Sequence, residues 1–300
     1  MHTKQIRIGS RESRLAVIQS GIIIDLIKQI EPDVQIELIT MKTTGDMILD
    51  RSLEQIGGKG LFVKELDLAL AEGRCDLTVH SLKDMPMELP LQLPILAFSE
   101  REDERDVLIL REGLDRLPEK PVIGTGSRRR ILQASPLFPG ASFKGIRGNL
   151  VTRLKKLDAG EYDALILAAA GVIRMGLKKR INRFFSVDEI IPSAGQGIMA
   201  VQGRRESEEE SLKFLCRLDS RESRIMALAE RSFVRTLDGG CSSPIAACAR
   251  IIDGCIVLRG LYFEETTERY VTGALKGAYE EPEELGYKLA MELKRKAEHE

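Results

Sequence analysis

Apolar and polar positions alternate in two different periods along the first part of the chain. Gln5–Ile8 alternates as a short strand does, and apolar residues then recur at helical spacing from Ser13 to Ile30. Residues 34–41 return to strand-like alternation. The pattern predicts a β-α-β unit, whose first turn, Gly9–Ser13, places hydroxyls and an arginine at a helix start.

A second unit of this kind is predicted within residues 107–187. Its central stretch, Val122–Ile131, reads V-I-G-T-G-S-R-R-R-I, a short strand that enters a glycine turn and then a Ser-capped helix. Free N–H groups and the positive end of the helix dipole attract anions at such a place. Guanidinium groups add forks suited to carboxylate or phosphate. We therefore favour an anion site over a solvated basic turn.

The remaining patterns predict a third region and two connections. A helical pattern runs from Ser220 through Phe233, and S-R-E-S-R at its start is interpreted as the cap of a surface helix without a ligand. Strand-like runs at 245–251, 256–261 and 270–274 and a helix from Glu284 follow, which fits a small α+β domain. A dense charge run at 98–106 and the Pro/Gly segment Ile191–Gly197 are interpreted as crossings between domains, the second as a hinge. The predicted domains are 1–98 with 196–217, then 99–195, then 218–300.

Composition narrows the function classes. The chain has 300 residues, and Lys+Arg 45 against Asp+Glu 46 gives a formal net charge of -1. A general nucleic-acid binder is therefore not expected, and any basic site must be local. The start lacks the apolar core of a signal peptide, and no stretch is long enough to span a bilayer, so we expect a cytoplasmic protein without a membrane partner.

The cysteines and histidines point away from a disulfide framework and from a metal centre. There are five cysteines without a C-x-x-C pair and three histidines, so we expect reduced thiols and no metal. Cys241 lies on a glycine- and serine-rich loop, where an accessible thiol can be a nucleophile, a covalent anchor or an ordinary structural residue. The other four cysteines have apolar neighbours and are expected to be small buried side chains.

Two further segments carry candidate chemistry. The strand at 75–79 ends in H-S-L-K-D-M-P, which places the hydroxyl of Ser81, the ammonium of Lys83 and the carboxylate of Asp84 at a carboxyl end. An ordinary polar turn before a proline is the alternative. Residues 56–62 form a glycine-rich segment with Lys59 and Phe62 but without the phosphate-binding pattern, so it is either a mobile flap or a plain loop.

Arginines fall at strand ends or helix starts throughout residues 107–187. One polyanionic ligand would explain this placement, which a scattered solvated face would not show. Outside the R-R-R run, these arginines are Arg147, Arg153 and Arg174.

Taken in order, the motifs resemble one known family. They are G-S-R-x-S-x-L-A, H-S-L-K-D-M-P, I-G-T-G-S-R-R-R, I-R-G-N-x-x-T-R-L, A-G-x-x-R-M-G, P-x-x-G-Q-G and L-D-G-G-C-S-S-P. Together they resemble the porphobilinogen deaminase (hydroxymethylbilane synthase) family, from Ile8 to about Ala249.

The resemblance implies a fold and an activity. The family's α/β fold has two domains that resemble type II periplasmic binding proteins, followed by a small α+β domain that carries a cysteine loop. Its enzymes are monomers that hold a dipyrromethane cofactor through a thioether. They add four porphobilinogen units with loss of ammonia and release hydroxymethylbilane by hydrolysis, a step of tetrapyrrole and haem biosynthesis.

The resemblance also implies residue roles, carried over by matching motifs. It makes Cys241 the covalent anchor of the cofactor and Asp84 the catalytic carboxylate, while Lys59 and Phe62 belong to the active-site loop and Gln196 to the hinge. Cofactor contacts are implied for Ser81, Lys83, Asp84, Thr125, Ser127, Arg129, Arg130, Arg147 and Arg153. Substrate contacts are implied for Arg11, Ser13, Arg147, Arg153 and Arg174.

Arg128 stands where the family usually has an apolar residue. A helix turns about 100° per residue, so three consecutive arginines cannot all face one ligand. We expect Arg128 to point to an acidic side chain or to solvent.

Two other classes of function compete with this interpretation. A non-catalytic binding module would explain the anion sites and the hinge, but neither Asp84 nor Cys241. A thiol-dependent transferase would explain Cys241 but not the array of arginines.

Overall fold

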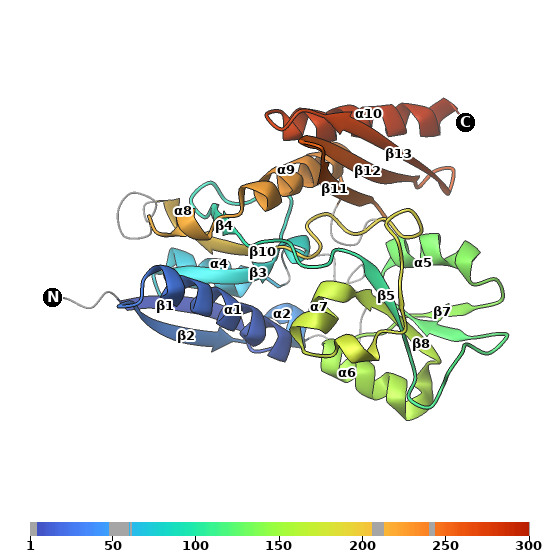
Figure 1. Cartoon of the computed structure of the whole chain (residues 1–300), viewed down its shortest axis with the longest axis horizontal. Coiled ribbons are helices and arrows are strands. Elements are labelled where there is room, and N and C mark those ends of the chain that lie inside the picture. Colours follow the sequence, from blue (N-terminus) through green and yellow to red (C-terminus); the bar gives the residue numbers. More distant parts are fainter. Residues whose placement is uncertain (1–4, 48–59, 61, 206–212, 240–243, 300) are drawn as a thin grey trace.

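The computed structural model describes residues 5–47, 60, 62–205, 213–239 and 244–299, which build three sheets with their helices (Figure 1). The first two sheets lie side by side, and the C-terminal sheet packs over both (Figure 1). The predicted fold class is confirmed in its layout: two α/β parts are followed by a small α+β part. The predicted domain limits stay a prediction.

The first sheet has the strand order β2-β1-β3-β10-β4, with β1 parallel to β2 and β3 and with β10 antiparallel to both of its neighbours. Ile6, Ile8 and Ile23 are buried where α1 covers this sheet. Its elements are β1 (Gln5–Arg11), α1 (Arg14–Ile30), β2 (Gln35–Met41), α2 (Thr44–Met47), α4 (Lys64–Ala71), β3 (Leu77–Ser81), η1 (Leu82–Asp84), β4 (Ile95–Phe98) and β10 (Met199–Gly203). The strand expected at 75–79 is thus present but lies two residues later.

The second sheet repeats the topology of the first, with the order β7-β6-β8-β5-β9. In each sheet, the second strand of the β-α-β unit pairs with the first strand and lies at the edge of the sheet. The third strand pairs with the first on one side and with an antiparallel strand on the other. Its strands are β5 (Asp106–Leu110), β6 (Val122–Gly124), β7 (Ser142–Lys144), β8 (Ala164–Ala168) and β9 (Arg183–Phe184). Its helices and turns are α5 (Arg128–Ala134), η2 (Ser135–Leu137), α6 (Leu150–Lys156), η3 (Leu157–Glu161), α7 (Ala169–Arg174) and η4 (Lys178–Arg180).

The third sheet is an antiparallel meander covered on one face by two helices. After α8 (Leu215–Leu218), its elements are α9 (Arg221–Thr236), β11 (Ala246–Ile252), β12 (Cys255–Glu264), β13 (Arg269–Gly277) and α10 (Pro282–His299). Gly260 on β12 lets the ring of Phe233 lie directly on the sheet, because a Cβ there would be 2.5 Å from the Phe233 ring. The predicted α+β arrangement is present.

Helix starts follow the sequence signals with one exception. Ser13 caps α1 and Ser220 caps α9, since each hydroxyl accepts a hydrogen bond from an N–H in the first turn. Ser127 stands at the cap position of α5, but its hydroxyl makes no capping bond. Its own N–H instead donates to Thr125 Oγ1 at 3.3 Å. The expectation of a Ser-capped helix is therefore wrong for α5, because the turn before it is closed by the threonine hydroxyl.

Two expectations about exposure are also wrong. The helix that begins with S-R-E-S-R is not a surface helix, because ten residues of α9 are buried between the first and third sheets. Cys216 is exposed and Cys255 is half-buried, whereas Cys75 and Cys248 are buried as expected. Cys241 lies outside the described residues.

One buried ion pair joins both crossings to the C-terminal part. Arg101 lies in the outgoing crossing, residues 99–105, and donates to Glu230 Oε1 on α9 at 2.6 Å. Arg101 also donates to the Gln196 carbonyl at 2.9 Å and to the Ala249 carbonyl at 3.1 Å. Glu230 accepts from the N–H of Gly195 in the return crossing, residues 185–198, at 2.6 Å. The two crossings are therefore fixed together on one carboxylate, whose pKa burial raises.

We expect Glu230→Ala to lower the free energy of unfolding by about 3–5 kcal/mol, because it leaves the Arg101 guanidinium buried without a counter-charge. Equilibrium urea unfolding checks this value. Glu72→Ala is the matched control, because its ion pair with Arg74 is half exposed and should contribute within about 1 kcal/mol. Equal losses in the two variants would contradict the role given to the buried pair.

Candidate active site

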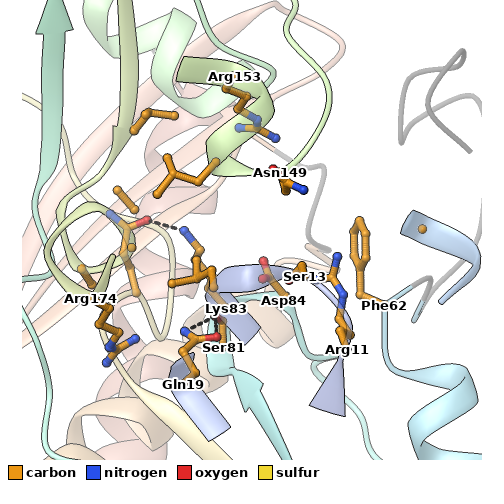
Figure 2. A pocket seen from close by; sticks show the side chains of 18 of the residues that line it. Arg11, Ser13, Gln19, Phe62, Ser81, Lys83, Asp84, Asn149, Arg153 and Arg174 are labelled. Carbon is orange, nitrogen blue, oxygen red and sulfur yellow. Dashed lines mark hydrogen bonds between the residues drawn. The ribbon is translucent and has the colours of Figure 1, made fainter. Parts of the chain in front are cut away.

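A cavity of about 560 Å³ opens between the first and second sheets. Its walls come from the end of β1, the start of α1, the turn after β3, the segment before α6, and α7, and the return crossing completes it (Figure 2). In both sheets these are the carboxyl ends of the parallel strands, where open α/β sheets bind their ligands. Arg11 and Ser13 from the first predicted anion-binding turn line one wall of the cavity, and Arg130 from the second stretch lines the other.

On the first sheet, a buried glutamine positions the predicted serine. Gln19 on α1 is only 5% exposed, and its Nε2 donates to Ser81 Oγ at 2.9 Å (Figure 2). Ser81 in turn donates to Gln19 Oε1 at 3.3 Å. Sequence analysis missed Gln19, although a polar residue on the apolar face of a helix was a signal for it.

Arg11 and Phe62 stack at the edge of the cavity. The Arg11 guanidinium lies 4.4 Å from the centre of the Phe62 ring, within the range of a cation–π contact (Figure 2). Phe62 packs on Gly45, where a Cβ would be 2.2 Å from the ring. Phe62 thus supports a cavity-lining cation, while Lys59 of the same predicted loop lies outside the described residues.

Lys83 and Asp84 project into the cavity from the turn η1. Lys83 Nζ donates to Gln196 Oε1 at 3.3 Å, and Figure 2 shows Asp84 between Lys83 and Arg11. Burial lowers the pKa of Lys83 to about 8, although Asp84 raises it; Arg130 lowers it further. Most Lys83 side chains are therefore charged at pH 7, but the group titrates close to neutrality.

The second sheet supplies guanidinium groups from the opposite wall. Arg153 Nε donates to the Gly148 carbonyl at 2.8 Å, and Arg174 donates to the Gly197 carbonyl at 2.6 Å. Burial lowers the pKa of Arg153 and of Arg174 to about 10 in each case, so both stay charged at pH 7. Arg147 and Asn149 line the same wall. Ser13, for which a substrate contact was predicted, lines the opposite wall.

The three consecutive arginines point in three directions. Arg128 is exposed and pairs with Glu265 at 3.2 Å, as expected from the helical turn angle. Arg130 lines the cavity and is bonded to Asp106 behind the wall. Arg129 is buried, and its NH1 contacts Asp106 Oδ2 at 2.8 Å and the Ile191 carbonyl at 2.7 Å.

Within the described part of the chain, Thr125, Ser127 and Arg129 are not among the residues that line the cavity. Thr125 and Arg129 are buried, and Ser127 is half-buried. Their predicted contacts with a cofactor stay predictions. Asp106, which sequence analysis missed, is the carboxylate that holds Arg129 and Arg130 in place.

Family models match most of the chain. One, described as "Porphobilinogen deaminase, dipyromethane cofactor binding domain", matches residues 6–212, and one described as "Porphobilinogen deaminase, C-terminal domain" matches residues 225–295. The chain belongs to the porphobilinogen deaminase family. The resemblance expected from the motifs is confirmed.

Curated porphobilinogen deaminases match over nearly their full length. The chain is 53% identical over 290 residues to the porphobilinogen deaminase of Ruminiclostridium cellulolyticum, and the match covers 97% of this chain and 98% of the relative. It is 54% identical to that of Ruminiclostridium josui, with the same coverage, and 43% identical to that of Synechococcus elongatus, with 97% and 92% covered.

Solved structures resemble the chain more loosely. A second substrate binding domain of a putative amino acid ABC transporter from Streptococcus pneumoniae is 15% identical, covers 71% of this chain and 90% of its own, and has a TM-score of 0.43. The aliphatic sulphonate binding protein SsuA from Escherichia coli is 12% identical, covers 78% and 71%, and has a TM-score of 0.42.

The cavity lining fits the chemistry of the dipyrromethane cofactor of this family. Two linked porphobilinogen units carry acetate and propionate groups, so the bound group is a polycarboxylate. Guanidinium groups bind carboxylates through charge-assisted hydrogen bonds. The lining offers such groups on both walls, in Arg11, Arg130, Arg147, Arg153 and Arg174.

We expect Arg153→Ala to raise the KM for porphobilinogen by roughly tenfold or more, because it removes a charge-assisted contact worth about 1.5–3 kcal/mol. Steady-state consumption of porphobilinogen measures this. Arg128→Ala is the matched control from the same α/β part, and its KM should stay within about twofold because Arg128 pairs with Glu265 outside the cavity. A larger effect in Arg128→Ala than in Arg153→Ala would contradict this division.

Proposed function

We propose that the chain joins four porphobilinogen units, with loss of ammonia, onto a dipyrromethane held by Cys241, and releases hydroxymethylbilane by hydrolysis. Asp84 is the catalytic carboxylate. One observation carries this proposal: a partly buried carboxylate stands among cations that converge from both walls of one cavity. Glu12, the other carboxylate among the described lining residues, is exposed.

Asp84 acts on the charge that develops during deamination. Loss of ammonia from the aminomethyl group leaves positive charge on the pyrrole ring of the substrate, and a fixed carboxylate nearby stabilises that charge. A preorganised group of this kind typically lowers a barrier by about 3–4 kcal/mol. Lys83 beside it cannot serve this purpose, because its charge has the wrong sign.

The cations bind and orient the carboxylates of the pyrrole chain, so that its rings lie close to Asp84. Arg11 and Lys83 approach from the first sheet, and Arg147, Arg153 and Arg174 from the second. When bound, the dipyrromethane supplies the pyrrole carbon to which the first porphobilinogen is joined. Gln19 on α1 fixes the Ser81 hydroxyl and so ties the end of β3, three residues before Asp84, to α1.

The setting of this activity is also proposed. The chain acts as a monomer in the cytoplasm, without nucleic-acid or membrane partners. Its formal net charge of -1 supports the absence of a nucleic-acid partner. Within the part of the chain that the structure describes, no helix has both the length and the apolar character to cross a membrane.

We expect intact mass spectrometry of the purified protein to show an added dipyrromethane, with a pink colour in Ehrlich's reagent. Cys241→Ser should lose the added mass, the colour and the activity, because a hydroxyl cannot form the thioether. Cys216→Ser is the matched control, since Cys216 is an exposed thiol and should keep the adduct. A parent protein that is unmodified and fully active would overturn the assignment.

We expect Asp84→Asn to slow ammonia release by roughly 10²–10³-fold while the folded protein keeps its adduct mass, because the amide has the carboxylate's shape but not its charge. Ammonia can be followed by a coupled assay, and folding by the thermal midpoint. Turnover retained in Asp84→Asn but lost in Glu12→Gln would assign the role to Glu12 instead.

A further inference from the structure

A fully buried carboxylate lies directly behind the cavity wall. Asp106, the first residue of β5, is 0% exposed, accepts hydrogen bonds from Arg130 and forms an ion pair with Arg129. Its Oδ1 accepts from Arg130 Nε at 3.0 Å and from Arg130 NH2 at 2.8 Å, and its Oδ2 contacts Arg129 NH1 at 2.8 Å. Gln196 Nε2 donates to Oδ1 at 2.9 Å. One carboxylate thus holds groups from α5 and from the return crossing.

Gln196 carries the connection on to the first sheet. Its amide donates to Asp106 on one side and accepts from Lys83 Nζ on the other, at 3.3 Å. Because an amide nitrogen only donates and an amide oxygen only accepts, these two bonds fix which end of Gln196 faces Lys83. Nε2 also donates to the Glu104 carbonyl at 2.7 Å, which restrains the amide further. Lys83, Gln196 and Arg130 all line the cavity, whereas Asp106 does not.

The charges agree with this connection. Burial alone would raise the pKa of Asp106, but Arg129 and Arg130 outweigh it and hold that pKa far below its usual value. The ionised carboxylate offsets one of the two adjacent guanidinium charges. The charged groups around Lys83 are Asp84 on its own turn and Arg130, Asp106 and Arg129 across the cavity wall.

We propose that Asp106 is a positioning residue, which holds Arg130 and, through Gln196, Lys83 with their cationic groups directed into the cavity. The proposal rests on the proposed function in one respect, that these cations bind carboxylates of the substrate or the growing chain. It adds that the orientation of cations on both sheets depends on one carboxylate that touches neither ligand.

A purely structural ion pair would behave differently. Buried ion pairs often contribute little net stability, and replacing one can leave the fold intact. Asp76 is a half-buried comparison within this chain, because it also pairs with two arginines, Arg7 at 2.9 Å and Arg204 at 3.4 Å. Asp76 and these arginines are not among the described residues that line the cavity. A readout at Lys83 therefore separates the two roles.

The test follows the titration of Lys83 in the whole protein. Competitive acetylation with acetic anhydride across pH 6–10, followed by peptide mass spectrometry, gives the midpoint at which Lys83 becomes reactive. In the parent protein the midpoint should lie near pH 8, the pKa that burial gives Lys83. In Asp106→Asn it should fall by about one pH unit, because a negative charge that favours the ammonium is lost while Arg129 and Arg130 remain. Asp76→Asn should leave it unchanged.

Two further measurements keep the test decisive. Gln196→Leu removes the amide but leaves the Asp106 ion pairs in place, so it should also lower the Lys83 midpoint even where Asp106→Asn does not fold. The KM for porphobilinogen should rise roughly tenfold in Asp106→Asn, with a smaller change in kcat, because a charge-assisted contact is misaligned. Asp76→Asn should keep the parent KM.

The outcomes are distinct. A Lys83 midpoint that is the same in the parent, Asp106→Asn and Gln196→Leu would overturn the proposal, as would a parent KM in Asp106→Asn. Acetylation needs no turnover, so a shifted midpoint supports the positioning role even if Asp84→Asn stays active and the proposed function fails. An unchanged Lys83 midpoint together with an inactive Asp84→Asn would remove Asp106 from the positioning role and leave Asp84 as the catalytic carboxylate.

Discussion

Mutual repulsion among buried cations is the constraint on which this molecule depends. A cavity meant for a polycarboxylate must keep guanidinium groups close together before any carboxylate arrives. The chain meets this need with acceptors that do not compete for the cavity. Arg153 and Arg174 donate to the carbonyls of Gly148 and Gly197, and Arg130 rests on Asp106 behind the wall. These backbone carbonyls and the buried Asp106 carboxylate hold the cations in place. They leave the side that faces the cavity open to a ligand.

Buried carboxylates also fix the two crossings. Glu230 accepts from Arg101 of the outgoing crossing and from the Gly195 N–H of the return crossing, while Asp106 accepts from Gln196 one residue further on. Two buried carboxylates, one in the C-terminal part and one in the second sheet, therefore hold the same short segment. That segment contains the glutamine that contacts Lys83, so the geometry of the site and that of the connection between sheets are set together.

Sequence patterns predicted the repeated β-α-β units, the helix start at Ser13, the helix cap at Ser220 and the outward direction of Arg128. Those features depend on neighbours in sequence, through helical period, capping and turn angle. The residues that were missed depend on partners far along the chain. Arg101 and Asp106 lie in a run of charges, F-S-E-R-E-D-E-R-D, that has the composition of a solvated segment, yet both are buried. Composition cannot distinguish these two buried charges from the more accessible charges beside them, because their partners Glu230 and Arg130 lie elsewhere. The same limit explains α9, which packs on the third sheet and, through Ala227 and Arg224, also on the first.

The position of β10 has a consequence for the order in which the chain becomes structured. β10 lies between β3 and β4, and its pairs join residues more than a hundred positions apart, such as Val201 with Val79. During synthesis, β4 has no neighbour in the first sheet until β10 emerges. All strands of the second sheet are complete earlier, by Phe184. The first sheet is thus begun first but completed after the second sheet. Contacts of such long sequence separation also form slowly. The turn after β3, which carries Lys83 and Asp84 into the cavity, gains its final support only when the far side of the cavity already exists.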